Sequence, residues 1–220
     1  MKSEKEKMLS GDYYNAGDES LVRERDYAKN LIFEFNHTRP SDKEKRKKIL
    51  KELIIAKGSF HIEAPFYCDY GYNIEVGENF YANYGCIILD VNKVQIGNNV
   101  LLAPNVHIYT AAHPVNPMER LTGKEFAKAI IIGNNVWVGG GTIICPGVKI
   151  GDNVTIGAGS VVTKDIPSNV VAAGNPCKVI REIGCYTISF LVVTDRKYVI
   201  SKWLMFSVVV IQSMVKNIDC

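Results

Sequence analysis

Residues 130–162, IIIGNNVWVGGGTIICPGVKIGDNVTIGAGSVV, decide the fold of this chain. Aliphatic residues recur there every sixth position, a period that fits neither the alternation of a strand nor the 3.6-residue turn of a helix. IGNN at 132–135 returns as IGDN at 150–153, so three hexads predict one triangular coil of a parallel β-helix. An ordinary β-rich domain with frequent turns is the competing interpretation, and it does not explain so strict a register. The two series expected to point inward are Ile132, Val138, Ile144, Ile150, Ile156, Val162 and Val136, Thr142, Val148, Val154, Ser160.

The same spacing continues upstream of this stretch. Val76, Ala82, Ile88, Val94, Val100 and Val106 are six residues apart, and VGEN at 76–79 has the composition of a corner, where glycine and asparagine tolerate positive φ. We expect residues 58–183 to form the β-helix domain, with about five coils of about 18 residues and a length of roughly 25 Å. One excursion, Tyr109–Ala129, leaves the hexad register, and internal loops of that length are usually functional.

Residues 1–57 are expected to be helical and to cap one open end of the solenoid, where strand edges would otherwise be exposed. Ser3 with Glu6 has the spacing of a capping box, and Gly11 can end that first helix. A second helix is expected at about 20–36, with Ala28, Leu31, Ile32 and Phe35 as its apolar stripe. Ser41 with Glu44 predicts a second capping box before a third helix, whose inward residues would be Ile49, Leu50, Leu53 and Ile54.

Residues 184–220 form an apolar tail without hexads, and we expect it to supply no chemistry. Its longest uncharged run, 203–215, would span only about 20 Å as a helix, so no stable membrane insertion is expected.

The net charge of +3 does not argue for nucleic-acid binding. The charged N-terminus does not resemble a signal peptide, and the six cysteines have no metal-like spacing, so reduced thiols in a cytoplasmic protein are expected.

Several motifs together resemble the maltose and galactoside O-acetyltransferases of the hexapeptide-repeat acyltransferase family. They are EKEKML at 4–9, FNHT at 35–38, CDYGYNI at 68–74, NFYAN at 79–83, LAPNVHIYTAAHP at 102–114, IGNNVWVGG at 132–140, IGAGSVVTKDIP at 156–167 and AAGNPCKVIREI at 172–183. The resemblance covers residues 1–183 and looks strongest to the maltose enzymes. It implies a mainly β fold built on a left-handed parallel β-helix, a homotrimer, and acetyl transfer from acetyl-CoA to a sugar hydroxyl.

Acetyl transfer to a hydroxyl needs a base, and histidine is the side chain best suited to that task near neutral pH. Of His37, His61, His107 and His113, only His113 lies in the excursion, and it matches the catalytic histidine of the family. Asn83 matches the family asparagine beside that histidine and could stabilise the oxyanion, as could the backbone N–H of Gly140. A surface histidine, a corner asparagine and a turn glycine are the structural alternatives.

The resemblance also assigns residues to the two ligands, coenzyme A and the acceptor sugar. Family positions for coenzyme A fall on Asn83, Gly140, Ala158, Thr163, Lys164, Lys178 and Arg181, of which the cationic side chains suit its phosphates. Asp69, Tyr81 and Asp90 are the candidates for the acceptor sugar. Ala16 and Val91 stand where some relatives carry acidic residues, which argues against a galactoside and favours maltose or glucose.

Two other classes remain open from the sequence. A zinc enzyme like the γ-class carbonic anhydrases needs three histidines, and His107 and His113 are only six residues apart, but no third histidine is near them in the repeat. A scaffold without turnover would keep the fold alone, and the joint presence of His113, Asn83 and the basic positions argues against it. We therefore expect no metal.

Overall fold

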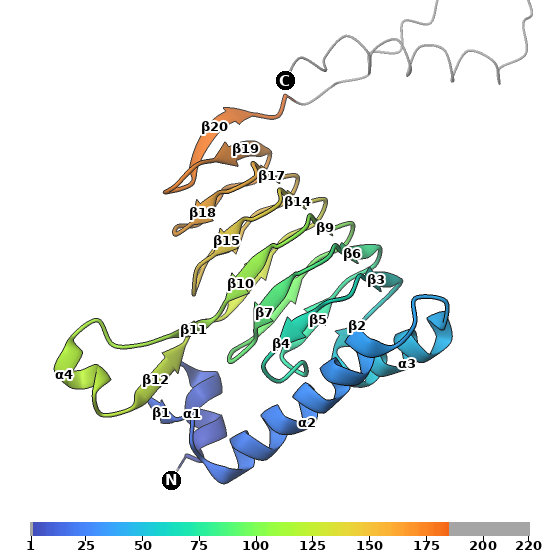
Figure 1. The fold of residues 1–220 in the computed structure, drawn as a ribbon. Helices are drawn as coiled ribbons and strands as arrows, with labels where there is room; N and C mark the ends of the chain where they lie inside the picture. The colour runs from blue at the N-terminus through green and yellow to red at the C-terminus, as the bar shows by residue number, and fades with distance from the viewer. Residues whose placement is uncertain (1, 185–220) are drawn as a thin grey trace, which may run out of the picture. The chain divides into compact units, whose positions relative to one another are not determined.

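The computed structural model describes residues 2–184, which form a mainly β chain wound into a parallel β-helix with three flat faces (Figure 1). Two faces are five-stranded sheets of order β16-β13-β8-β5-β2 and β18-β15-β10-β7-β4. The third is seven-stranded, β20-β19-β17-β14-β9-β6-β3, and only its last pair, β19 with β20, is antiparallel. The β-helix predicted from the hexads is confirmed, with five complete coils and part of a sixth, which adds a bridge from Ile166 to Ile150 on the first face and β19 on the third.

The strands are short, as expected for hexads. The first face holds β2 (Ile55–Ala56), β5 (Ile74–Val76), β8 (Val94–Ile96), β13 (Ile130–Ile132) and β16 (Lys149–Ile150). The second holds β4 (Tyr67–Cys68), β7 (Ile87–Leu89), β10 (His107–Tyr109), β15 (Ile143–Ile144) and β18 (Val161–Val162). The third holds β3 (Phe60–Ile62), β6 (Phe80–Ala82), β9 (Leu101–Leu102), β14 (Trp137–Val138), β17 (Thr155–Ile156), β19 (Val170–Ala173) and β20 (Lys178–Glu182).

Both predicted inward series are buried. Every member of the two series between residues 132 and 162 is at most 2% exposed, including the two hydroxyl residues Thr142 and Ser160. Each of these hydroxyls donates to the carbonyl of Gly157, so neither is left without a partner in the core. The stacked aliphatic side chains therefore form one continuous core along the solenoid.

The coils are not all 18 residues long, which corrects the expected uniform repeat. Ile132 pairs with Ile150, eighteen residues on, but Ala56 pairs with Val76 and Val76 with Ile96, each twenty residues on. The two additional residues lie after β4 and after β7, where the chain passes from the second face to the first. The excursion leaves the solenoid at the equivalent place, after β10.

Another edge of the prism is held by a ladder of asparagines. Asn79, Asn99, Asn135, Asn153 and Asn169 all have φ between 55° and 61°. The Nδ2 of each donates to the Oδ1 of the next at 2.8–3.0 Å. Asparagine is thus preferred at these corners for two reasons, because it tolerates the left-handed region and because its amide continues the ladder.

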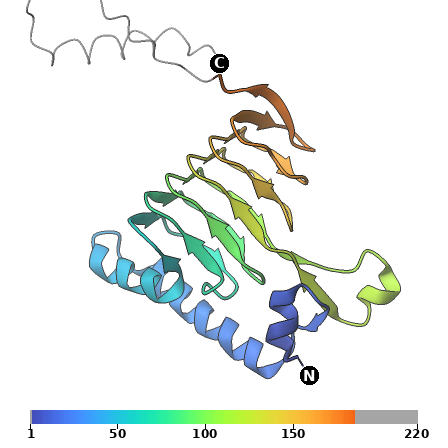
Figure 2. The ribbon, with the colours of Figure 1, turned by 180° about the vertical axis from the view of Figure 1, so that it is seen from behind.

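Helices cover the N-terminal end of the solenoid, as predicted (Figures 1 and 2). They are α1 (Glu4–Ser10), α2 (Glu19–His37) and α3 (Lys43–Leu53). The capping box of Ser3 and Glu6 is present, and Gly11 ends α1 in the left-handed region. The predicted box at Ser41 and Glu44 is wrong: Asp42 is the N-cap of α3, because its carboxylate, one residue later, accepts the N–H of Lys45.

The N-terminal cap was expected to extend through residue 57, but β2 already joins the solenoid at Ile55. The excursion is more ordered than a loop: β11 (Ala111–Ala112) and β12 (Lys124–Ala127) pair antiparallel around the one-turn helix α4 (Pro117–Arg120). None of the described helices is long and apolar enough to cross a bilayer. The expectations for the tail concern residues 185–220 and lie outside the described part of the chain.

Candidate functional site

Three of the predicted site residues lie on one edge of the prism. The corners that follow β4, β7 and β10 are the three places where the coil is expanded, and they carry Asp69, Asp90 and His113 respectively. The register of β4, β7 and β10 stacks these corners one above another. The structure therefore gathers the candidate base and two candidate acceptor carboxylates on one edge of the solenoid.

A small sheet of order β1-β12-β11 positions His113, where β1 is Tyr14–Asn15. Tyr14 pairs with Glu125, and Ala112 pairs with Phe126, so His113 stands opposite Glu125 one step beyond the last pair. The Tyr14 hydroxyl donates to Glu125 Oε2 at 2.9 Å, and Glu125 Oε1 lies 4.0 Å from His113 Nε2. Tyrosine, carboxylate and imidazole thus form one row across three strands.

An arginine from α2 faces the same region. One nitrogen of the Arg25 guanidinium donates to the Tyr70 hydroxyl at 2.6 Å, and another donates to the carbonyl of Ala16 at 2.6 Å. Asp69 is half-buried; burial raises its pKa and Glu125 raises it further, while Arg25 opposes the shift. The hydrogen bond from Arg25 to Tyr70, the residue that follows Asp69, ties α2 to the corner that carries Asp69.

Asp90, which was expected at the acceptor sugar, is buried and bonded to the backbone of the preceding coil. The side chain is 0% exposed, and its Oδ1 accepts the backbone N–H groups of Asp69 and Tyr70, both at 2.9 Å. Its Oδ2 accepts the N–H of Asn73 at 3.3 Å. Desolvation outweighs these bonds and raises the pKa of Asp90 to about 7. In this arrangement the Asp90 carboxylate holds the corner that presents Asp69.

A second, smaller apolar core supports the site. It consists of Met8, Tyr14, Leu21, Tyr70, Val91 and Ala127. Beside it, the buried amide of Asn92 donates to the carbonyls of Met8, Leu9 and Ala127 at 3.1–3.3 Å, which ties α1 and β12 to the corner after β7. Val91 is therefore an internal packing residue in this chain, and the N-terminal helix is part of the framework that holds the site.

The remaining predicted residues lie elsewhere in the chain. Asn83, Gly140 and Ala158 occupy the corners between the third and second faces, so the sheet β18-β15-β10-β7-β4 separates them from the His113 edge. Tyr81 lies on the third face, with its ring stacked on His61. The Asn83 side chain accepts the N–H of Tyr84 at 2.8 Å. One copy of the chain does not bring Asn83 or Tyr81 to His113.

The coenzyme A candidates are accessible. Within residues 2–184 the N–H groups of Gly140 and Ala158 donate to no protein acceptor, and these two residues stand at equivalent corners of successive coils. Thr163 and Lys164 are exposed just after β18, and Lys178 and Arg181 are exposed on β20. None of these three cationic side chains forms an ion pair with another described residue.

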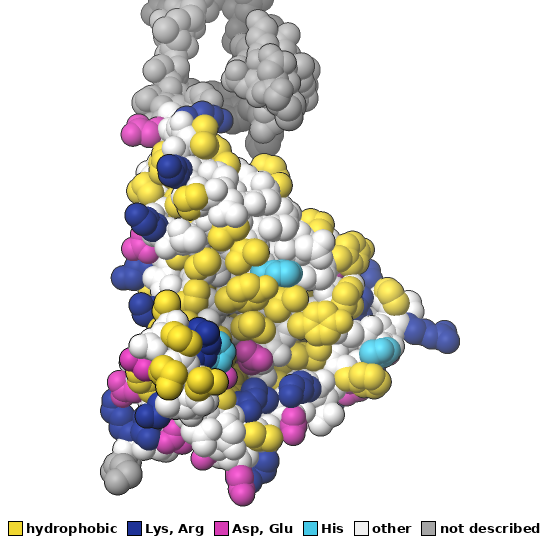
Figure 3. Space-filling view, turned by 60° about the vertical axis from the view of Figure 1, so that its left-hand side comes forward, with side chains coloured by type: hydrophobic (Ala, Val, Ile, Leu, Met, Phe, Trp, Pro, Cys, Tyr) yellow, Lys and Arg dark blue, Asp and Glu magenta, His cyan; other side chains and the backbone are white. Residues whose placement is uncertain are grey.

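The face between the two edges is largely apolar. Register places Tyr67, Ile87, His107, Ile143 and Val161 in one outward row across its five strands. Figure 3 shows apolar side chains gathered over the flank of the solenoid, with one histidine among them. A contiguous apolar surface of this kind is typical of an interaction site.

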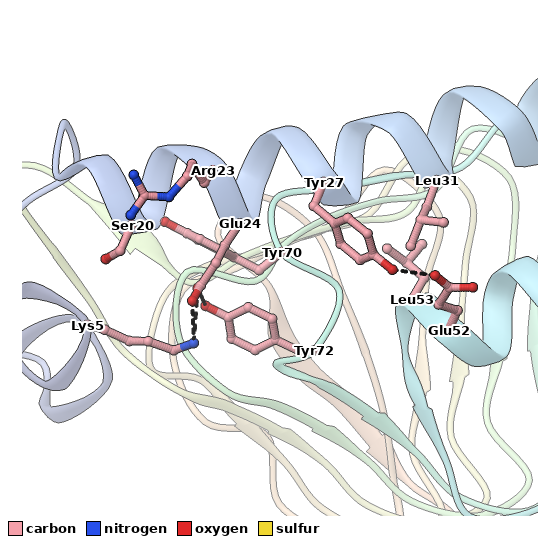
Figure 4. A pocket seen from close by; sticks show the side chains of 10 residues that line it. All are labelled: Lys5, Ser20, Arg23, Glu24, Tyr27, Leu31, Glu52, Leu53, Tyr70 and Tyr72. Carbon is pink, nitrogen blue, oxygen red and sulfur yellow. Dashed lines mark hydrogen bonds and ion pairs between the residues drawn. The ribbon is translucent and has the colours of Figure 1, made fainter.

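A cavity of about 510 Å³ lies between α1, α2 and the corner that follows β4 (Figure 4). Lys5 and the Tyr72 hydroxyl both donate to Glu24, and Tyr27 donates to Glu52. His113 does not line this cavity. The pairings of Glu24 attach α1 and α2 to the corner that follows β4, and the pairing of Tyr27 attaches α2 to α3.

The zinc alternative finds no assembled donor set in the described residues, since no three His, Cys, Asp or Glu side chains converge there. The imidazole of His107 is bonded through Nδ1 to the hydroxyl of Tyr109 at 2.6 Å. His107 and His113 therefore take part in different local networks.

Comparison with known proteins agrees with this architecture. Residues 7–58 match the maltose acetyltransferase hexapeptide capping motif, and residues 129–164 match the bacterial transferase hexapeptide of six repeats. A putative acetyltransferase of Dictyostelium discoideum is 56% identical over 82% of this chain and 95% of its own length. The fold, the repeats and this relative define the class: the chain belongs to the hexapeptide-repeat acetyltransferase family.

Within that family, two solved structures are similar over most of the chain. The maltose O-acetyltransferase of Clostridium difficile 630 is 58% identical, with a TM-score of 0.83 over 84% of this chain and 99% of that one. A galactoside acetyltransferase in complex with coenzyme A is 48% identical, with a TM-score of 0.81 over 84% and 92%. The resemblance inferred from the motifs is confirmed.

Arg25, Glu125 and Tyr14 were not singled out from the sequence. Arg25 lies three residues before Ala28 on the buried face of α2, and a charge inside an apolar stripe was the available signal. Nothing in the sequence indicates that Glu125 and Tyr14 are cross-strand partners. That pairing depends on the register of a sheet that joins β1, near the N-terminus, to the excursion.

Proposed function

We propose that this chain transfers acetyl from acetyl-CoA to a hydroxyl of a small sugar such as maltose or glucose, with His113 as the general base. The observation that carries the proposal is the position of His113 in a chain of this family: it follows β11 on the edge of the prism that also carries Asp69, and Glu125 Oε1 lies 4.0 Å from its Nε2. Carboxylates and guanidinium groups are suitable partners for the hydroxyls of a sugar.

The reaction then needs few groups. The imidazole removes the proton of the acceptor hydroxyl as its oxygen attacks the thioester carbonyl. The oxyanion that forms is stabilised by a hydrogen-bond donor, for which we propose the amide of Asn83 or the N–H of Gly140. Collapse of the intermediate breaks the C–S bond, and the leaving sulfur receives the proton from His113.

Acetyl-CoA is the proposed co-substrate, without a metal. The N–H groups of Gly140 and Ala158, which have no acceptor among residues 2–184, can donate to the amide carbonyls of its pantetheine arm, and the hydroxyl of Thr163 can donate to a phosphate oxygen. Lys164, Lys178 and Arg181 provide positive charge for the phosphates. Lysine at 178 supplies charge without the bidentate geometry of an arginine.

The complete site requires more than one copy. His113 and the Asn83–Gly140–Ala158 group lie on opposite edges of one apolar sheet, so we propose a homotrimer in which that sheet faces the neighbouring copy. Each cleft would then combine the His113 edge of one chain with the Asn83 edge of the next. Mixing inactive His113→Ala chains with inactive Asn83→Ala chains should restore part of the activity, and a monomer by light scattering at micromolar concentration would contradict this arrangement.

The proposed acceptor follows from two side chains. Val91 is packed in the small core, and Ala16 carries no charge, so neither can receive a sugar hydroxyl as the acidic residues at these positions in some relatives could. Arg25 and Asp69 remain available, and we propose that they bind the acceptor. The free thiols of Cys68, Cys86, Cys145 and Cys177 suit a reducing compartment, and we propose a cytoplasmic location.

The test is release of coenzyme A thiol from acetyl-CoA in the presence of maltose, glucose and a galactoside, with the acetylated sugar identified by mass spectrometry. We expect thiol release that depends on the sugar and is faster with maltose or glucose than with the galactoside. Release at the same rate without any sugar, or no release at all, would contradict acetyl transfer.

A further inference from the structure

Glu125 stands between a buried tyrosine of the small core and the proposed base. It lies on the central strand of the β1-β12-β11 sheet, between Tyr14 on one side and His113 on the other. Its Oε2 is bonded to the Tyr14 hydroxyl, but within residues 2–184 its Oε1 accepts no hydrogen bond and faces His113 Nε2 at 4.0 Å. One carboxylate oxygen is therefore anchored and the other is directed at the proposed base.

The hydrogen bond that anchors Glu125 is shielded from solvent because its donor, Tyr14, is buried. Tyr14 is 2% exposed, whereas the side chain of Glu125 is 26% exposed and that of His113 is 56% exposed. Burial and the neighbouring Glu125 charge both raise the pKa of Tyr14, so its hydroxyl remains a proton donor throughout the useful pH range. The hydrogen bond from Tyr14 holds the Glu125 carboxylate toward His113 and keeps it from turning out into the solvent.

We infer, on the basis of the acetyl transfer proposed above, that Glu125 is the positioning residue of His113: its carboxylate orients the imidazole and stabilises the imidazolium that forms during transfer. The inference does not depend on which ring nitrogen takes the proton, because the positive charge of an imidazolium is shared by both.

The proton and bond changes balance without any change in Glu125. The imidazole takes the proton of the acceptor O–H, and the acceptor oxygen forms a C–O bond to the acetyl carbon. The C–S bond then breaks, and the sulfur takes the proton from the imidazolium to leave as the thiol. Glu125 remains a carboxylate, and it lowers the free energy only of the states in which His113 is charged.

The size of the effect follows from distance and exposure. Opposite charges about 4 Å apart attract strongly at the edge of a protein, but solvent weakens that attraction for partly exposed side chains. We expect the loss of the charge to lower kcat about tenfold. The KM for acetyl-CoA should change less than twofold, because its candidate contacts lie on another edge of the chain.

The experiment compares three variants by thiol release with acetyl-CoA and maltose. Glu125→Gln keeps an acceptor for the Tyr14 hydroxyl and removes the charge, so we expect the tenfold loss in kcat. Tyr14→Phe releases the anchor while keeping the charge, and we expect a smaller loss. Glu119→Gln, an exposed carboxylate of the same excursion without a described partner, is the matched control and should behave as the wild type.

A purely structural role is separated by combining Glu125→Gln with His113→Ala. If Glu125 acts through His113, the second substitution should cause less than a twofold further loss. A tenfold loss that persists without His113, or a Glu125→Gln enzyme with kcat within twofold of the wild type, would overturn the inference. Melting curves check folding; if the glutamine variant is unfolded, an unchanged kcat in Tyr14→Phe would overturn it.

The outcomes also separate this inference from the proposed function. A wild type that transfers no acetyl overturns both. A wild type that is active and depends on His113, with an unaffected Glu125→Gln variant, overturns only the role of Glu125.

Discussion

Gly71 is a position where the structure predicts a specific cost of adding one methyl group. It lies in the corner that presents Asp69 and Tyr70, with φ of +78°, and a Cβ there would meet the Leu53 carbonyl oxygen at 2.4 Å and Leu53 Cδ1 at 2.6 Å. Leu53 is the last residue of α3 and is buried, so it cannot move aside freely. The Gly71→Ala change therefore combines backbone strain with a clash against the helical cap.

Gly123 provides the matched control. Its φ is +73°, but an added Cβ would meet nothing within 4 Å. Left-handed backbone costs an alanine about 1–2 kcal/mol, partly offset by about 0.4–1 kcal/mol from the restricted unfolded chain. We therefore expect Gly123→Ala to lower the free energy of unfolding by about 1 kcal/mol. The clash at Gly71 adds the about 1–3 kcal/mol typical of overpacking, for a total of about 2–4 kcal/mol.

The assay is urea unfolding followed by circular dichroism, with the two variants and the wild type at the same protein concentration. Because the corner carries Asp69, Gly71→Ala should also raise the KM for the sugar, whereas Gly123→Ala should not. Equal destabilisation by the two substitutions would refute the close approach of this corner to α3 on which the reasoning depends.

The asparagine ladder and the buried carboxylate yield two further predictions. Asn135→Gly keeps the positive φ but removes two side-chain bonds of the ladder, so it should cost about 1–3 kcal/mol in urea unfolding, and a stability within error of the wild type would contradict a structural ladder. Asp90 has a pKa raised to about 7, so the folded state binds its proton more tightly than the unfolded state does. Its contribution to stability should therefore fall as the pH rises from about 4 to about 7, by at most about 4 kcal/mol. Asp90→Asn should make the stability between these pH values flatter, and an unchanged pH dependence would contradict the raised pKa.

The hexads were sufficient to predict the solenoid because each inward residue is fixed by its own local repeat. Ile132, Val138 and Ile144 needed no long-range information to be placed in the core. The spacing of inward residues also contained the information on coil length. Successive inward residues are eight rather than six positions apart from Cys68 to Val76 and again from Ile88 to Ile96. That shift was missed, and it marks the very corners that carry Asp69 and Asp90. Handedness came only from the family resemblance.

The site was harder to predict than the fold because it depends on pairings between distant segments. His113 could be selected from its place in the excursion, but its partners come from β1, β12 and α2. Asp90 was expected near the acceptor from the resemblance, and the structure shows three bonds from its carboxylate to the backbone of the preceding coil. A carboxylate is an equally good acceptor for a sugar and for a backbone N–H, and only the fold decides between the two.

The most direct test of the account is the steady-state rate of thiol release by His113→Ala with acetyl-CoA and maltose. Removing a general base should lower kcat by about 10²–10⁴-fold. The KM for acetyl-CoA should stay close to that of the wild type, because the imidazole acts on the proton of the acceptor. A folded His113→Ala enzyme that keeps near-normal kcat would contradict the central claim that this histidine carries the chemistry.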